Sequence, residues 1–431
     1  MKVALVVNSF PRLSETFIAR KFLELVRRGY DVHVVCDESN PDVWHQFPES
    51  LPRQVLRRRV HVAWPHQPRW LVLALLPFIL LTCLLRKPST TCRYLWKGTE
   101  LFGAGILRQF YLDAQLIALD PDIIHFEFGT IAVAKSHLKE LLGCKIIASF
   151  RGYDLNFSGL DDPAYYERTW QSVDVAHFLG NDLKERAYRR GCPADKPYAL
   201  IPPAIDLDYY RPELKKHHEC VGTPERPLRI VSVGRLEWKK GYEYGLEAVS
   251  LLSGQGITFE YHIIGSGNYT DAIAFARHQL SVEDNVHLLG ALPVTAVRRE
   301  MLWADVLMHS AVSEGFCNAV MEAQAMELPI VCTNADGLAE NVADGESGFV
   351  VPRRSPKEMA ERLSLLAQDP SLRSRMGSAG RRRVQTLFRI QDQIASFEEL
   401  YRTVMQREIK YSSVSTRNRI RSGEAGDEVR R

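Results

Sequence analysis

The sequence predicts an α/β protein of two Rossmann-like domains that face each other across a cleft. Two series of short apolar runs alternate with helix-like segments, one over 1–210 and one over 228–390. The apolar runs are continuous, which is typical of strands buried on both faces of a parallel sheet. Between the two series, 211–227 is polar and rich in His and Lys, so we expect it to be the linker. A last helix is expected over 391–410, and the polar tail 411–431 is predicted to be disordered.

Each predicted element follows from the local pattern. Ser14 can cap a first helix between the two opening strands, and this βαβ unit has no G-x-G-x-x-G fingerprint of a dinucleotide site. The predicted strands are 3–7, 32–36, 122–126, 144–150, 173–179, 198–201, 229–234, 258–264, 286–289, 305–308, 329–332 and 349–352. Helical periodicity fills most of the intervals of the second domain and continues over 356–368, 371–387 and 391–406.

Composition narrows the function classes. The 431 residues carry a net charge of only +3, which argues against nucleic acid as the main partner. The eight cysteines form no C-x-x-C pair, which favours reduced thiols over a disulfide framework or a zinc site. The first residues turn polar too quickly for a signal peptide. Together these features indicate a cytoplasmic protein.

One segment of the first domain has a different character. The stretch 70–85 is almost entirely apolar, follows a basic run at 53–59, and is closed by the cations of 86–87. Its 16 residues fall short of the ~20 that span a bilayer, and Pro77 interrupts it. The basic flanks and Trp70 favour a helix at an anionic membrane surface. A buried core helix and a true span are the alternatives.

The stretch 309–325 contains two carboxylates, Glu314 and Glu322, between two predicted strands. A loop there would lie at the carboxyl end of a strand, where open α/β sheets bind ligands. We expect the following helix to start near Phe316, with Glu322 about two turns in. Its free N–H groups would suit a phosphate or a sugar hydroxyl. Alternatively, Glu314 is a helix-start acid favoured by the helix dipole and Glu322 a solvated carboxylate.

Three segments of the second domain form one pattern, namely V-G-R-L-E-W-K-K-G at 233–241, I-I-G-S-G at 263–267 and S-E-G-F-C-N-A-V-M-E-A-Q-A at 313–325. Together they resemble the retaining GT-B glycosyltransferases of family four, which use nucleotide-sugar donors, and 335–352 resembles the family's continuation. The segment 8–18, N-S-F-P-R-L-S-E-T-F-I, is similar to the opening of bacterial exopolysaccharide glycosyltransferases of the colanic-acid type. The resemblance implies the GT-B fold, with its C-terminal helix returning toward the first domain.

The chemistry of such a donor agrees with the residues. A departing diphosphate needs its negative charge neutralised, and Arg235 and Lys240 are spaced to place two cations over the cleft. Two exposed surface cations are the alternative. The resemblance assigns Glu322 to the ribose hydroxyls and Glu314 to the donor sugar. The donor residues that it implies are Arg235, Lys240, Gly265, Gly267, Leu292, Glu314, Gly315, Phe316, Cys317, Asn318 and Glu322.

The resemblance also implies a mechanism without a protein nucleophile, a metal or a cofactor, in which the acceptor attacks from the side that the diphosphate leaves. Its catalytic residues would be Glu314, Arg235, Lys240 and Arg151. A D-x-D occurs at 206–208, a pattern that holds a divalent ion in another glycosyltransferase class. Here it resembles the family's turn at the exit of the first domain.

One position departs from the family. Arg151 stands where members often carry His, and a guanidinium cannot act as a base near neutral pH. Arg151 could bind a phosphate or an acidic sugar, or it could pair with Asp154 and shape the loop. The acceptor site is predicted to contain Asn8, Ser9, Phe10, Ser14, Glu15, His125 and Asp154. For His125 a place in the core is the alternative.

The sequence therefore predicts an enzyme that moves a hexosyl group from a nucleoside-diphosphate sugar to a polysaccharide or lipid-linked saccharide, peripherally at the cytoplasmic membrane face. Two other functions stay open: a nucleotide-sugar epimerase of similar architecture and a non-catalytic scaffold subunit.

Overall fold

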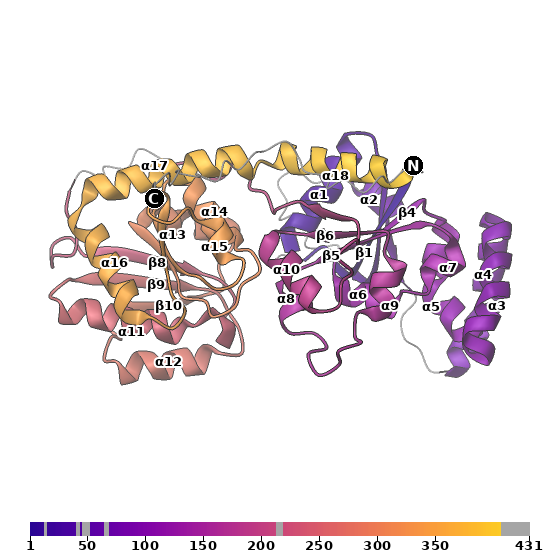
Figure 1. Cartoon of the computed structure of the whole chain (residues 1–431), viewed down its shortest axis with the longest axis horizontal. Coiled ribbons are helices and arrows are strands. Elements are labelled where there is room, and N and C mark those ends of the chain that lie inside the picture. Colours follow the sequence, from indigo (N-terminus) through magenta and orange to yellow (C-terminus); the bar gives the residue numbers. More distant parts are fainter. Residues whose placement is uncertain (13–14, 40–43, 45–51, 64–68, 213–218, 407–431) are drawn as a thin grey trace, which may run out of the picture.

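The computed structural model describes residues 1–12, 15–39, 44, 52–63, 69–212 and 219–406. Ser14, part of the expected linker and the tail lie outside these residues. The chain folds into two lobes, each built around one parallel sheet (Figure 1). The predicted pair of Rossmann-like domains is confirmed.

The first sheet has seven parallel strands in the order β3-β2-β1-β4-β5-β6-β7. Its strands are β1 (Lys2–Phe10), β2 (Asp31–Ser39), β3 (Val60–Val62), β4 (Ile123–Phe126), β5 (Lys145–Phe150), β6 (Val175–Phe178) and β7 (Tyr198–Leu200). Strand order reverses between β1 and β4, which places the switch point of the sheet at the carboxyl ends of these two strands.

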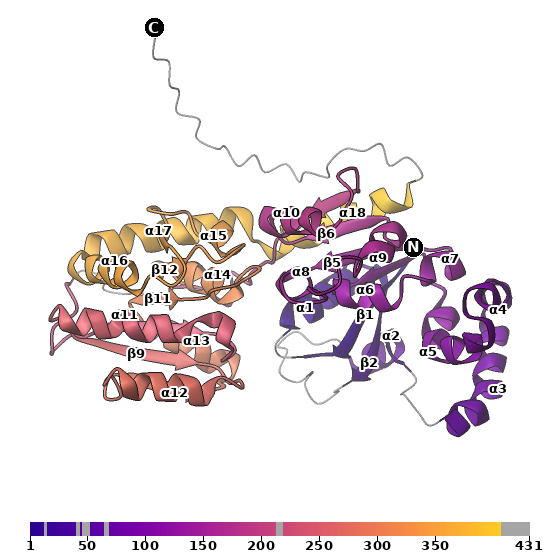
Figure 2. The same cartoon turned by 60° about the horizontal axis from the view of Figure 1, so that its bottom comes forward.

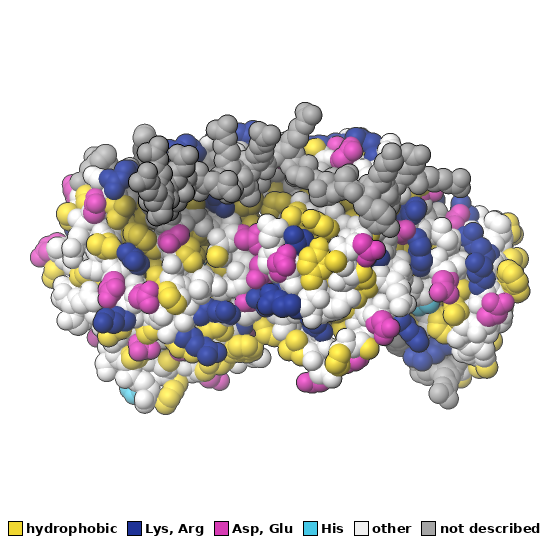
Figure 3. All heavy atoms as spheres, viewed as in Figure 1, with side chains coloured by type: hydrophobic (Ala, Val, Ile, Leu, Met, Phe, Trp, Pro, Cys, Tyr) yellow, Lys and Arg dark blue, Asp and Glu magenta, His cyan; other side chains and the backbone are white. Residues whose placement is uncertain are grey.

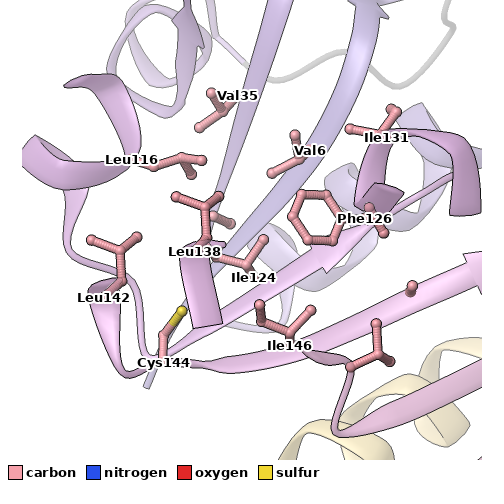
Figure 4. Packing of buried hydrophobic residues seen from close by; sticks show 14 of the residues in the cluster. Val6, Val35, Leu116, Ile124, Phe126, Ile131, Leu138, Leu142, Cys144 and Ile146 are labelled. Atoms are coloured by element: carbon pink, nitrogen blue, oxygen red, sulfur yellow. The ribbon is translucent and has the colours of Figure 1, made fainter. Parts of the chain in front are cut away.

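Helices cover both faces of this sheet. They are α1 (Thr16–Arg27), α2 (Arg53–Arg59), α3 (Arg69–Arg86), α4 (Pro88–Phe102), α5 (Ile106–Leu119), α6 (Gly129–Ala134), α7 (Leu138–Leu142), α8 (Gly152–Asn156), α9 (Glu167–Ser172) and α10 (Asn181–Arg189), with a 3₁₀ turn η3 (Gly103–Gly105). On one face, side chains such as Val6, Ile124 and Ile146 meet Leu116 of α5 and Leu138 of α7 (Figure 4). Because alternate strand residues point to opposite faces, a second core forms on the other side.

The second sheet has six parallel strands in the order β10-β9-β8-β11-β12-β13. Its strands are β8 (Leu228–Val233), β9 (Phe259–Ile264), β10 (Val286–Gly290), β11 (Val306–His309), β12 (Ile330–Thr333) and β13 (Gly348–Val351). The helices of this part of the chain are α11 (Tyr242–Gly254), α12 (Thr270–Gln279), α13 (Val294–Trp303), α14 (Asn318–Ala325), α15 (Leu338–Asn341), α16 (Pro356–Gln368), α17 (Pro370–Leu387) and α18 (Ile390–Met405), with a 3₁₀ turn η4 (Trp238–Lys240).

The last helix returns to the first domain, as the family resemblance predicted. The chain crosses back from the second domain to the first between α17 and α18. This second crossing lies next to the first one, because the Ile205 N–H donates to the Phe388 carbonyl at 2.9 Å. Figure 1 shows α18 lying across the first lobe beside α1. Phe397, Leu400 and Tyr401 are buried in the core that α1 and the first sheet form. The C-terminal helix is therefore part of the first domain's core.

The apolar segment 70–85 lies in α3, which forms with α4 the end of the first lobe farthest from the second lobe (Figures 1 and 2). One face of α3, with Leu76, Ile79 and Cys83, is buried. The opposite face exposes large apolar side chains, among them Trp70 and Phe78. The core-helix alternative thus describes the buried face of α3, while contact of the exposed face with a membrane stays a prediction. Within the described residues, no helix combines the length and apolar character that crossing a membrane requires.

Candidate active site

The carboxyl ends of β8 and β11 carry the residues that the sequence singled out in the second domain. Gly241 follows Lys240 with φ 59°, and a Cβ atom there would lie 2.4 Å from the Ser310 carbonyl oxygen. Glycine is therefore needed for the loop after β8 to pack against the loop after β11. This packing brings the Lys240 ammonium onto the Glu314 carboxylate.

The Lys240–Glu314 ion pair is shielded, with only 11% and 16% of the two side chains exposed. Burial alone would lower the pKa of Lys240, but Glu314 and Cys317 together outweigh it and raise that pKa. Burial would raise the pKa of Glu314, yet Lys240 and His309 together hold it well below its ordinary value. His309 Nε2 lies 3.4 Å from the Glu314 carboxylate. Despite burial, Cys317 and Glu314 raise the pKa of His309 to about 9.

The helix after this loop begins later than the sequence predicted. Cys317 is extended (φ −107°, ψ 109°) and α14 starts at Asn318, not near Phe316. The Asn341 side chain holds Cys317 in place, because its Oδ1 accepts from the Cys317 N–H at 3.1 Å and its Nδ2 donates to the Cys317 carbonyl. Glu322 consequently stands little more than one turn into the helix, where two turns were expected.

Glu322 faces the crossing between the domains. The buried Tyr210 and Arg20 of α1 are both close enough to its carboxylate to favour the ionised form. Burial raises the pKa of Glu322, and these two groups offset only part of that rise. The solvated-carboxylate alternative for Glu322 does not describe this environment.

Arg235 is the most open cation of the site. Its side chain is 62% exposed, and Nη1 lies 2.6 Å from Glu237. Its charge also acts on Glu15 of the first domain. Burial raises the pKa of Glu15, and the cations Arg12, Arg151 and Arg235 offset part of that rise. On the face in Figure 3, Lys and Arg side chains lie near the boundary of the two lobes together with Asp and Glu side chains. Arg235 is therefore near enough to Glu15 of the other domain to act on it electrostatically.

Close backbone approach explains the two glycines of the 263–267 loop. A Cβ atom on Gly265 would lie 1.9 Å from the Gly234 carbonyl oxygen, and one on Gly267 would lie 2.1 Å from that of Leu236. The loops after β8 and β9 are therefore in direct contact. Leu292, which follows β10, is half-buried and packs against the apolar cluster that includes Ile264 at the end of β9.

The two domains touch where Arg151 ends β5. A Cβ atom on Gly315 would lie 2.8 Å from the Gly152 nitrogen, so the backbones of the two loops are in van der Waals contact. The Arg151 guanidinium binds Glu127, with Nη2 3.1 Å from Oε2 and Nε 3.0 Å from the main-chain oxygen. Arg151 and Glu314 thus stand on the two sides of one contact.

Arg151 does not pair with Asp154 through its guanidinium, so that alternative needs correction. Asp154 is buried and its carboxylate accepts the backbone N–H groups of Arg151 and Thr130, each at 2.9 Å, which fixes the start of α8. The guanidinium's partner, Glu127, is buried as well and forms a second ion pair with Lys21 of α1. The sequence signal for Glu127 was its place directly after β4, at the switch point of the sheet.

Comparison with known proteins decides the family. The model of the glycosyl transferases group 1 matches residues 215–383, and that of the glycosyl transferase 4-like domain matches residues 14–204. The chain therefore carries a glycosyl transferase 4-like domain followed by a glycosyl transferases group 1 domain. The relatives of this glycosyltransferase include WcaL of Escherichia coli K12, named for colanic acid biosynthesis, at 26% identity over 85% of this chain and 91% of that protein. AmsK of Erwinia amylovora, an amylovoran biosynthesis glycosyltransferase, is 27% identical over 90% and 96%.

Solved structures agree on the fold. Sucrose-phosphate synthase from Thermosynechococcus elongatus superposes with a TM-score of 0.69 at 16% identity, covering 94% of this glycosyltransferase and 99% of that chain. Anabaena HepE in complex with UDP and glucose gives 0.69 at 14% identity, over 94% and 100%. The fold is therefore GT-B, as the resemblance predicted.

The predicted acceptor residues of the glycosyltransferase do not all reach the cleft. His125 is fully buried between Tyr401 and Ser149, at 2.8 Å from each, so the core alternative describes it. Phe10 is buried against Phe22 and Trp44. Asn8 and Ser9, at the end of β1, and Glu15, at the start of α1, remain accessible.

Metal-ligating side chains do lie close together in two places. Ligand atoms of His309, Glu314 and Cys317 fall within 4.8 Å of one another, and so do those of Glu260, His262 and His287. At the first place the Lys240 ammonium already occupies the Glu314 carboxylate, so a cation would meet like charge. In the D-x-D segment, Asp206 Oδ1 accepts the N–H groups of Asp208 and Tyr209, at 3.1 and 3.0 Å, which makes a turn.

A cavity of about 1100 Å³ lies between the domains. Its described lining comes from the start of α10, from β7 and the segment 201–204 after it, from the end of α17 and the first part of α18, and from Phe316 and Glu340. It does not include Glu314, Lys240 or Glu322. Phe316 packs edge-on against Phe388 at 5.6 Å.

Proposed function

We propose that this glycosyltransferase transfers a hexosyl group, with retention, from a nucleoside-diphosphate sugar to a polysaccharide or lipid-linked saccharide in cell-surface polysaccharide biosynthesis. The observation that carries the proposal is the shielded Lys240–Glu314 pair, which stands beside the open Arg235 and opposite Arg151. Cations on both walls of one boundary suit a substrate with a diphosphate at its centre. The names of WcaL and AmsK support the polysaccharide product, and the UDP–glucose complex of HepE supports the donor class.

The roles follow from position. Arg235 and Lys240 bind the diphosphate, Glu314 accepts hydroxyls of the donor sugar, and Glu322, beside Tyr210, accepts the ribose hydroxyls. N–H groups at the start of α14 add hydrogen bonds to phosphate or sugar.

The reaction that we propose uses no protein nucleophile and no metal. The bond between the anomeric carbon and the diphosphate oxygen breaks, and the acceptor oxygen bonds that carbon on the same face. The acceptor proton passes to an oxygen of the departing phosphate. The cations stabilise the charge that develops on the leaving group. Glu314, ionised and held by Lys240, steadies the sugar as positive charge grows on it.

A panel of nucleotide sugars tests the proposal. The matching donor should raise the melting temperature of the full chain, since a ligand at 100 times its Kd adds about 2.7 kcal/mol of stability. Glu322→Ala should abolish both this shift and sugar transfer. Glu358→Ala, an exposed carboxylate on α16, is the matched control and should change neither.

Product analysis with and without acceptor completes the test. An epimerised nucleotide sugar formed without acceptor would contradict transfer. So would full activity of Glu322→Ala, or the absence of a thermal shift with every nucleotide sugar.

We also propose that the first domain binds the cytoplasmic face of an anionic membrane through α3, α4 and α5, which would place the enzyme beside a lipid-linked acceptor. Exposed apolar residues recur three to five positions apart along α3, and further ones lie on α4 and α5, which pack against α3. Its members are Trp70, Leu73, Phe78, Leu81 and Leu85 of α3, Trp96 and Leu101 of α4 and Leu107 of α5, each at least 45% exposed. Arg86, Lys97 and Arg108 are interspersed among them, which suits anionic lipid.

Vesicle sedimentation tests this surface. Wild type should sediment with phosphatidylglycerol vesicles, less with phosphatidylcholine, and less at high salt. Phe78→Ser should weaken binding about tenfold, because burying such a side chain contributes roughly 1.5–3 kcal/mol. Phe275→Ser removes a side chain of similar exposure (63%) from α12 and should bind like wild type. Equal sedimentation of both variants would contradict the proposed surface.

A further inference from the structure

We infer that Asp336 is a positioning residue for the transfer reaction: it fixes the loop that carries Glu314 and ties that loop to the first domain. The inference rests on the function proposed above. Asp336 follows β12, in the turn that leads to α15, and its side chain is only 3% exposed. Asp336 lies in the 335–352 segment that resembles the family's continuation, but the sequence predicted no role for it.

The backbone of Asp336 is the first sign of a special role. Its φ of 52° lies in the left-handed region, which costs a non-glycine residue about 1–2 kcal/mol. Strain of this kind persists where the surroundings hold the residue in place, and it gathers at functional sites.

Within the second domain, Asp336 holds the peptide of Glu314. Its Oδ2 accepts from the Ser313 hydroxyl at 2.6 Å and from the Glu314 N–H at 3.2 Å. The next residue, Gly337, donates its N–H to the Glu314 carbonyl at 3.0 Å. The backbone N–H of Glu314 is thus bound by Asp336, and its backbone carbonyl is bound by Gly337.

The same carboxylate reaches the first domain. Asn156, at the end of α8, donates to Oδ2 at 3.0 Å and also to the Ser313 hydroxyl. Arg186 of α10 binds Oδ1 at 2.5 Å, and Arg353 of the second domain binds the same oxygen at 3.2 Å. Asp336 therefore accepts from both domains at once, and its single charge is matched by two guanidinium groups.

A second carboxylate of the turn region strengthens this connection. Glu340 accepts the backbone N–H groups of Asn181 and Asp182 at 3.0 and 2.8 Å, and so caps the start of α10 from across the boundary. Asp182 in turn binds Arg186 at 2.7 Å. We call these hydrogen bonds and ion pairs of Asp336 and Glu340 the polar clamp. It lies beside the contact between Gly152 and Gly315, which joins the two walls of the site.

Asp336 should affect the position of the loop that carries Glu314, and not the charge at the reacting atoms. Asp336 itself touches neither Lys240 nor Arg235 in the described contacts; it acts through the backbone of Glu314 and through Asn156 and Arg186. Because a displacement of about 1 Å can cost about 10²-fold in rate, a loosened loop should lower kcat more than it weakens donor binding.

Asp336→Gly is the decisive variant, because it removes all the bonds and the backbone strain together. It should fold with a melting temperature close to wild type, transfer sugar about 10- to 100-fold more slowly, and change the donor-induced thermal shift little. Asp336→Asn keeps an oxygen for Ser313 and Glu314 but loses the ionic bonds to the arginines. Its kcat should therefore lie between that of wild type and that of Asp336→Gly. Ser281→Gly, at an exposed residue with φ 51°, is the matched control for the backbone change and should leave kcat unchanged.

Hydrogen exchange separates this inference from the proposed function. Amides of 152–156 and 313–315 should exchange faster in Asp336→Gly than in wild type or Ser281→Gly, whether or not the donor is known. Wild-type exchange or a wild-type kcat in Asp336→Gly would overturn the inference. If wild type transfers no sugar from any donor while the exchange result holds, the proposed function fails and the clamp stands.

Discussion

Adding one methyl group at Gly315 tests whether the two backbones that meet at the domain boundary must touch for transfer. In Gly315→Ala the new Cβ would lie 2.8 Å from the Gly152 nitrogen and 2.9 Å from its Cα. Favourable separations are about 3.5–4.0 Å, so the loops must part by roughly 0.6–1 Å. The backbone of Gly315 lies outside the left-handed region, so alanine adds no strain of its own there.

The free-energy cost of this clash depends on which part of the structure moves to relieve it. In a rigid core such overpacking costs about 1–3 kcal/mol. Here the obstacle belongs to the other domain, so the domains can separate slightly and the free energy of unfolding should change by less than this. The cost should appear in transfer instead, where a misplacement of about 1 Å lowers the rate about 10²-fold, or ~2.7 kcal/mol.

The assay is steady-state release of nucleoside diphosphate alongside urea unfolding. Gly254→Ala is the control, because it ends α11 with no atom within 4 Å of the added Cβ, and it should leave transfer unchanged. Gly152→Ala approaches the same contact from the other side, at 3.0 Å, so the two changes combined should cost less than the sum of the single losses. A wild-type rate for Gly315→Ala would refute the reasoning, because the closed contact would then not be the reacting arrangement.

Three further predictions concern the buried charges. Lys240→Met and Glu314→Gln should each destabilise the fold by about 3 kcal/mol in urea unfolding, since each leaves a buried charge unpaired, and the double variant should lose much less than the sum. The pKa of His309, raised to about 9, means that its contribution to stability is complete below about pH 6.5 and is lost as the pH rises through about 9; His309→Gln should remove this slope from the pH profile of the melting temperature. Glu127→Gln should destabilise by about 3–5 kcal/mol, and adding Arg151→Met should restore part of it; equal stability of the single and double variants would contradict the ion pair.

Much of the fold could be predicted from the sequence, because parallel strands buried on both faces leave continuous apolar runs. The site was harder where long-range contacts decide. Cys317 stays extended only because the side chain of Asn341 binds it, so the start of α14 could not be read locally. Glu127 went unassigned because its partners, Lys21 and Arg151, come from different elements of the first domain. The helices α4 and α5 were not predicted, since their mixed composition gives a weaker periodic signal than the strands.

The pairing of Lys240 with Glu314 bears on how the donor would be used. An ammonium has three N–H donors, so a bond to Glu314 leaves others for phosphate oxygens. A bound diphosphate then meets an ion pair, whose attraction for it in the ground state is smaller than that of a bare cation. As the bond to the sugar breaks, charge grows on the leaving oxygen and the ammonium's attraction for it grows in step, which is the kind of interaction that accelerates a reaction. Arg235, with its exposed side chain, suits the initial capture of the donor instead. The burial of Lys240 and the exposure of Arg235 therefore favour one cation for the transition state and one for binding.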